Sequence, residues 1–63
     1  MNPDQTSIQS AYEDAVQKLY AGLFDAYVTA GGDVTQEQQA DGHFTTGLRF
    51  ARKSRDRALA LLA

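Results

Sequence analysis

The residues that could do chemistry in this chain are few, and the first is its single histidine, His43. A histidine can ligate a metal ion or act as a general base. A helix that holds a metal through two side chains places them at positions i and i+4. Asp41 is only two residues away and points elsewhere on a helix, so His43 has no such ligand pair. We interpret His43 as a surface or interface residue.

The other candidates lack the geometry that their chemistry needs. Glu13 and Asp14 are adjacent, so on a helix they diverge by about 100° and cannot act as a carboxylate pair. No strand-to-helix turn exposes a nucleophile among Ser7, Ser10 and Ser54. Residues 42–47 have the G-x-x-x-x-G spacing of a phosphate loop, but Leu-Arg follows instead of Lys-Ser/Thr. The sequence therefore predicts no catalytic residue, no cofactor and no metal site.

Composition and length exclude further classes. The chain has 63 residues, a net charge of −2 and no cysteine, which excludes a disulfide scaffold and thiol catalysis. Its hydrophobic content is 43%, but ten of these residues are alanines, so the core of one copy is thin. So short a chain does not enclose a substrate pocket by itself, and we expect no enzyme. The first residues lack the basic and apolar regions of a signal peptide, and no stretch is long and apolar enough to cross a bilayer, so we expect a cytoplasmic protein.

Two helical patterns occupy the chain. Asn2 as N-cap, Pro3 at the first helical position and Gln5 completing a capping box predict a first helix over about 3–30, which Gly31 ends. After a turn at 31–35, a box of the T-x-x-Q form predicts a second helix over about 36–62 with Thr35 as its N-cap. Asp41 is an alternative cap, because Gly42 is unfavourable inside a helix. The whole chain, 1–63, is then a single all-α hairpin domain.

Each predicted helix has an apolar stripe at intervals of three and four residues. In the first helix it consists of Ile8, Tyr12, Ala15, Val16, Leu19, Leu23, Ala26 and Ala30. In the second it consists of Ala40, Phe44, Gly47, Leu48, Ala51, Ser54, Ala58, Leu59, Leu61 and Leu62. An antiparallel hairpin that turns near position 33 places Leu19 opposite Gly47 and Gly22 opposite Phe44, so large side chains face small ones. We therefore expect both glycines to be packing positions, and we expect a leucine at Gly22 to be too large.

Several apolar side chains lie outside these stripes and exceed what one partner helix can cover. They are Tyr20, Phe24, Tyr27, Val28 and Phe50. We expect them to form an oligomer interface, most simply in a homodimer that is a four-helix bundle with twofold symmetry.

Charge is divided between the two halves of the chain. Residues 1–34 carry a net −4 and residues 35–63 a net +2. We expect the acidic helix to pair with the basic one, which sets their orientation. Four basic side chains are candidates for contact with a partner: Arg49, Arg52, Lys53 and Arg57. Arg55 differs, because it falls within the apolar arc near Ala11, where it would reach Asp14 or the Tyr12 hydroxyl, or extend to water.

These observations favour a non-catalytic interaction or regulatory module that acts through helix-mediated protein contacts. The alternative is a nucleic-acid-binding modulator that uses the basic cluster, although the acidic chain and the wide spread of that cluster oppose it. In length and layout alone, the chain resembles the small Rop-type hairpins, which form dimeric four-helix bundles and bind RNA. That resemblance implies basic side chains on the first helix, which has only Lys18. The acidic first helix also argues against binding to an anionic membrane surface.

Overall fold

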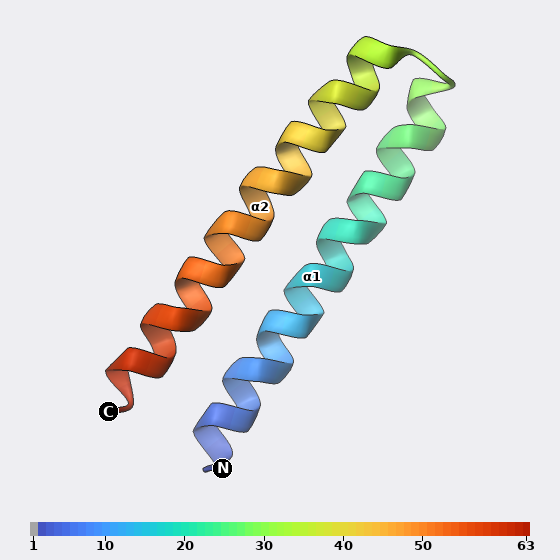
Figure 1. Cartoon of the computed structure of the whole chain (residues 1–63). Coiled ribbons are helices and arrows are strands. Elements are labelled where there is room, and N and C mark those ends of the chain that lie inside the picture. The colour runs from blue at the N-terminus through green and yellow to red at the C-terminus, as the bar shows by residue number, and fades with distance from the viewer. Residues whose placement is uncertain (1) are drawn as a thin grey trace.

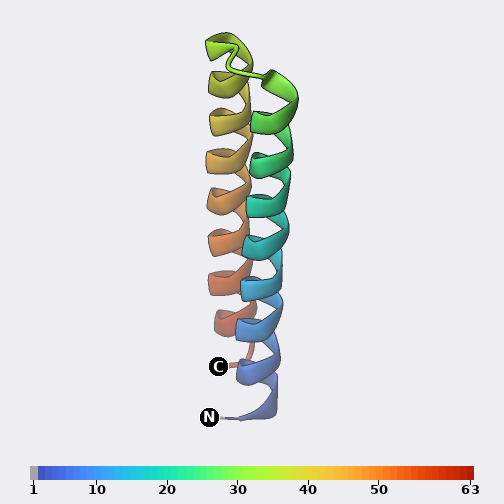
Figure 2. The same ribbon diagram turned by 90° about the vertical axis from the view of Figure 1, so that its right-hand side faces the viewer.

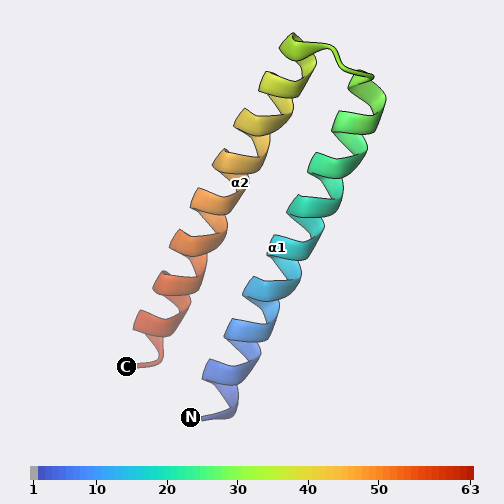
Figure 3. The same cartoon turned by 45° about the vertical axis from the view of Figure 1, so that its right-hand side comes forward.

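The computed structural model describes residues 2–63, which form two helices and no strand. Helix α1 spans Pro3–Ala30 and helix α2 spans Val34–Leu61. They lie side by side and antiparallel, with the chain termini at the end away from the turn (Figures 1, 2 and 3). The Cα atoms extend over 46 × 15 × 10 Å, so the molecule is a rod only one layer thick. The two wide faces of this layer are therefore open.

Helix α1 begins and ends where its capping residues predict. The Asn2 side chain accepts a hydrogen bond from the Gln5 backbone N–H at 2.8 Å, and the Asn2 backbone N–H donates to Gln5 Oε1 at 3.1 Å. This is a complete capping box, with Pro3 at the first helical position. At the other end Gly31 adopts the left-handed conformation, with φ 55°, and its N–H donates to the Tyr27 and Val28 carbonyls.

Helix α2 begins earlier than the sequence pattern predicts. Its N-cap is Asp33, whose Oδ1 accepts from the Gln36 backbone N–H at 3.0 Å, so the predicted cap at Thr35 is wrong. The alternative at Asp41 is also wrong, because Asp41 and Gly42 are both inside the helix. Gly31 and Gly32 both have positive φ, 55° and 91°, and reverse the chain within two residues. Asp33 is therefore the first residue with the extended backbone that a cap requires.

The predicted stripe of α1 faces α2. All eight of its residues are buried or half-buried, although only Ala30 is fully buried, at 8% exposure. The stripe of α2 is partly wrong, because Ser54, Leu61 and Leu62 are exposed whereas Glu37 and Arg55 are half-buried. The end of α2 lies beside the first turn of α1, which is polar. Leu61 and Leu62 therefore find no apolar side chain to pack against and stay exposed.

The register of the hairpin is confirmed at one glycine and corrected at the other. A methyl group at Gly47 would overlap Leu19 Cδ2 and lie 3.2 Å from Leu19 Cδ1, so Leu19 fills the space at Gly47 as predicted. A methyl group at Gly22 would meet nothing within 4 Å. The expected crowding at Gly22 is therefore wrong within the hairpin. Gly22 lies about 60° around α1 from Leu19, at the open flank of the stripe.

Candidate functional site

The exposed apolar side chains are the first candidate surface. Tyr20, Phe24 and Val28 of α1 are 62%, 56% and 66% exposed, and Phe50 of α2 is 60% exposed. The α1 residues lie on the side and back of their helix, whereas Phe50 borders a groove between the helices. The five predicted interface residues are therefore not one continuous patch.

Tyr27, the fifth of these residues, makes a contact across the hairpin. Its hydroxyl donates a hydrogen bond to Asp41 Oδ1 of α2. This hydrogen bond raises the pKa of Tyr27 above its ordinary value, and partial desolvation and the negative charges of Asp41 and Glu37 act in the same direction. The sequence pattern did not predict this pair. The register that sets Leu19 level with Gly47 could have indicated it, since it brings Tyr27 within one turn of Asp41.

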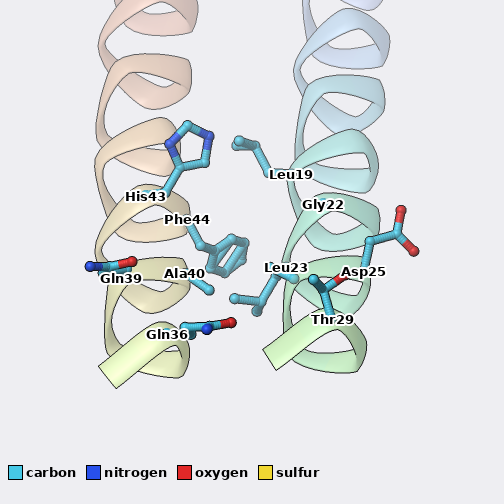
Figure 4. Close-up of a pocket in the computed structure, with 11 residues that line it drawn as sticks. Leu19, Gly22, Leu23, Asp25, Thr29, Gln36, Gln39, Ala40, His43 and Phe44 are labelled. Atoms are coloured by element: carbon cyan, nitrogen blue, oxygen red, sulfur yellow. The ribbon is translucent and has the colours of Figure 1, made fainter. Parts of the chain in front are cut away.

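A groove of about 560 Å³ lies between the helices near the turn (Figure 4). Leu19, Leu23 and Phe44 line it, and Figure 4 shows them between the two helices. His43 borders the groove on α2, while the Asp25 carboxylate points outward from α1 and away from the imidazole. The groove therefore offers apolar contact and no acid–base pair.

A second groove, of about 420 Å³, lies towards the termini and is lined by Ile8, Ala15, Phe50 and Ala51 among others. Arg55 lies in its wall, with the guanidinium carbon 4.4 Å from the centroid of the Tyr12 ring. Arg55 Nε also donates to Asp56 Oδ1 at 3.0 Å. The guanidinium thus covers the ring of Tyr12 in a cation–π contact and does not bond Asp14, which pairs with Lys18.

Both grooves lie on one face of the rod. Their lining residues on each helix recur at intervals of three and four, so they follow a single stripe. Leu19, packed at Gly47, separates the two grooves. We call this side of the molecule the groove face. Eight of the residues that line it are small, and they are Ala11, Ala15, Gly22, Ala26, Ala40, Ala51, Ser54 and Ala58.

The basic cluster of α2 is exposed to solvent. Arg49, Arg52, Lys53 and Arg57 are all exposed, and none of them is in an ion pair among residues 2–63. The two ion pairs in that range are Lys18–Asp14 within α1 and Arg55–Asp56 within α2. The expected ion pairing between the acidic and the basic helix is therefore not what holds the hairpin together. Apolar contact does so, and the opposite charges remain on the surface.

Metal binding and membrane insertion are two further possibilities for the part of the chain that the structure describes. No group of three or more potential ligands within residues 2–63 could hold a metal ion. Neither α1 nor α2 is apolar enough over a sufficient length to cross a membrane. Comparisons with protein-family models, with curated proteins and with solved structures found no match to this chain. The surfaces described above are therefore the features of this chain that indicate its function.

Proposed function

We propose that this protein is a non-catalytic interaction module that acts through helix-mediated protein contacts and works as a homo-oligomer, most simply a dimeric four-helix bundle. The observation that carries the proposal is the exposure of its large apolar side chains. Eight of them, including Tyr20, Phe24 and Phe50, are exposed in the single hairpin, while Ala30 is the one buried hydrophobic residue among residues 2–63.

The accessible area supports the same proposal. The hairpin exposes 4786 Å², whereas a compact monomer of 6.9 kDa exposes about 4000 Å². The excess is on the order of 800 Å², which is the area that one partner contributes to a standard protein–protein interface. A single layer of two helices cannot hide this surface, but a second layer can.

Sedimentation equilibrium over a range of protein concentrations tests the proposal. We expect dimers at micromolar concentration and a melting temperature that rises with concentration, because association stabilises the folded state by mass action. A folded 6.9 kDa species at every concentration would contradict self-association. For a partner protein, cross-linking in the native host should recover one protein reproducibly with the wild type and lose it with Phe24→Gln. Gln38→Ala, at an exposed position of α2, serves as the control.

A second candidate is binding to nucleic acid through the basic cluster, favoured by the observation that these four side chains are exposed and outside any ion pair of the described residues. Titration with structured RNA and duplex DNA at about 50 and 200 mM salt tests this, since phosphate contacts weaken steeply with salt. Micromolar binding that falls over this range and is lost on replacing Arg49, Arg52 and Lys53 with Gln would favour nucleic acid. Without binding at low salt, the protein-contact proposal stands.

A further inference from the structure

We propose that the groove face is covered by a second copy of the chain, with both turns at the same end and each α1 lying on the α2 of the other copy. This inference rests on the self-association proposed above and adds which face associates and in which orientation. The observations behind it are the two grooves, the charges of the two helices and the register of the hairpin.

The groove face suits close approach of another helix layer. Its two grooves, about 560 and 420 Å³, are open depressions along the same side of the rod. The half-buried Leu19, Leu23 and Phe44 are accessible through one of them, and Phe50 stands at the border of the other. An equivalent layer laid on this face would cover these side chains, and the exposed excess of on the order of 800 Å² matches what such a partner must cover.

Charge decides between the two symmetric ways of laying one hairpin on another. Helix α1 carries four carboxylates and Lys18, a net −3, whereas α2 carries five basic and three acidic side chains, a net +2. With turns at opposite ends, α1 would lie on α1 and α2 on α2, so like charges would meet. With turns at the same end, each α1 lies on an α2 of opposite charge. The second arrangement is therefore favoured.

The register brings particular groups together in that arrangement. Because Leu19 is level with Gly47 in the hairpin, residues whose numbers sum to about 66 are level between the two copies as well. Asp25 is therefore within one turn of the second copy's His43, and both residues border the groove. An acidic side chain of α1 and the histidine of α2 thus approach each other between copies, along the face that the dimer covers.

In this arrangement, the dimer interface contains fewer of the apolar residues that the sequence pattern predicted for it. Phe50 belongs to the covered face, because it lines a groove. Tyr20, Phe24 and Val28 lie on the side and back of α1 and stay accessible in the dimer. Under the proposed function, these three side chains remain available for contact with a partner protein.

Two glycines provide a matched pair of variants. Gly22 and Gly42 are both inside helices, and a Cβ at either would meet nothing within 4 Å in the hairpin. Gly22 lines a groove, whereas Gly42 lies on the back of α2. We expect Gly22→Leu to raise the dimer dissociation constant about tenfold or more, because the new side chain occupies space that the second copy needs. Gly42→Leu should leave the dimer dissociation constant within about twofold of the wild-type value. Both variants should keep the circular dichroism spectrum of a helical protein.

The orientation is tested by a label near the turn. The chain has no cysteine, so Thr35→Cys, at an exposed site next to the turn, gives one nitroxide per copy. Helices in contact lie about 8–10 Å apart, so turns at the same end place the two labels within about 25 Å in pulsed paramagnetic resonance. Turns at opposite ends would separate them by about 40 Å or more, since the hairpin is 46 Å long.

The outcomes separate this inference from the proposed function. If the wild type never dimerises, self-association fails and this inference fails with it. If the wild type dimerises but Gly22→Leu binds as tightly, or the labels lie far apart, only the face or the orientation proposed here is overturned. A dimer that Gly22→Leu weakens and Gly42→Leu spares, and in which the two labels lie within about 25 Å of each other, supports the inference.

Discussion

The guanidinium carbon of Arg55 lies 4.4 Å from the centroid of the Tyr12 ring, so a half-buried charge on α2 covers an aromatic residue of α1. Such cation–π contacts contribute about 0.5–1 kcal/mol at exposed sites and more when desolvated. The Arg55–Asp56 ion pair adds little, because Asp56 is exposed.

We predict a coupling free energy of about 0.5–1 kcal/mol between Arg55→Met and Tyr12→Leu. Urea unfolding of the two single variants and the double variant, at one protein concentration, measures it. A control cycle combines Arg57→Met, at an exposed arginine, with Tyr12→Leu and should show no coupling free energy. Additive effects in both cycles would mean that the Arg55–Tyr12 contact contributes nothing to stability.

Because Leu19 packs against Gly47, we expect stability to depend on the size of the side chain at position 47. Gly47→Leu should lower the free energy of unfolding by about 1–3 kcal/mol, because Leu19 already occupies the space. Adding Leu19→Ala should restore part of the loss by exchanging the large and the small residue. Gly42→Leu, with open space around it, should instead gain about 1 kcal/mol from helix propensity. Thermal unfolding of all four proteins checks the order, and equal effects at Gly47 and Gly42 would refute the packing.

The N-cap of α2 can be assigned by comparing substitutions at Asp33 and Thr35. Asp33→Ala should destabilise the protein by about 0.5–2 kcal/mol, because the Gln36 backbone N–H loses its acceptor. Thr35→Ala, at the cap that the sequence pattern predicted, should change stability by less than about 0.5 kcal/mol. Chemical denaturation measures both, and the reverse order would place the start of the helix at Thr35.

Alkaline pH should weaken the hairpin through Tyr27. Its pKa in the folded protein is raised above the ordinary 10.0, so the folded state binds this proton more tightly than the unfolded chain does. The stabilisation is complete below the ordinary value and is lost as the pH rises through the raised one. The urea midpoint of the wild type should therefore fall more over this interval than that of Tyr27→Phe, which cannot ionise. Asp41→Asn should remove most of the difference, and Tyr20→Phe should behave as the wild type does.

The sequence predicted those parts of the fold that depend on local chemistry. The capping box at Asn2 and Gln5 and the glycine at position 31 determine where α1 begins and ends, and both act through adjacent backbone. The apolar spacing of α1 identified its inner stripe. The start of α2 was missed because Asp33 and Thr35 are both good caps, and the conformation of Gly32 decides between them.

The candidate surfaces were only partly accessible to sequence reasoning. An amphipathic pattern identifies the side of each helix that faces its neighbour. It does not predict on which face of the hairpin a groove forms, because that depends on how the two helices pack. The open space at Gly22 and the groove beside Phe50 appear only once α1 and α2 are placed together. The cation–π contact of Arg55 likewise requires that its side chain lie along the seam.

The turn at Gly31 and Gly32 also decides whether the chain closes on itself or exchanges a helix with another copy. Both residues hold positive φ, which other residues adopt at a cost. With helix-forming residues at these two positions, α1 and α2 would continue as one long helix. Each half could then make the same contacts with the opposite half of a second chain, as in domain swapping. Two glycines therefore separate a compact hairpin from an entwined assembly.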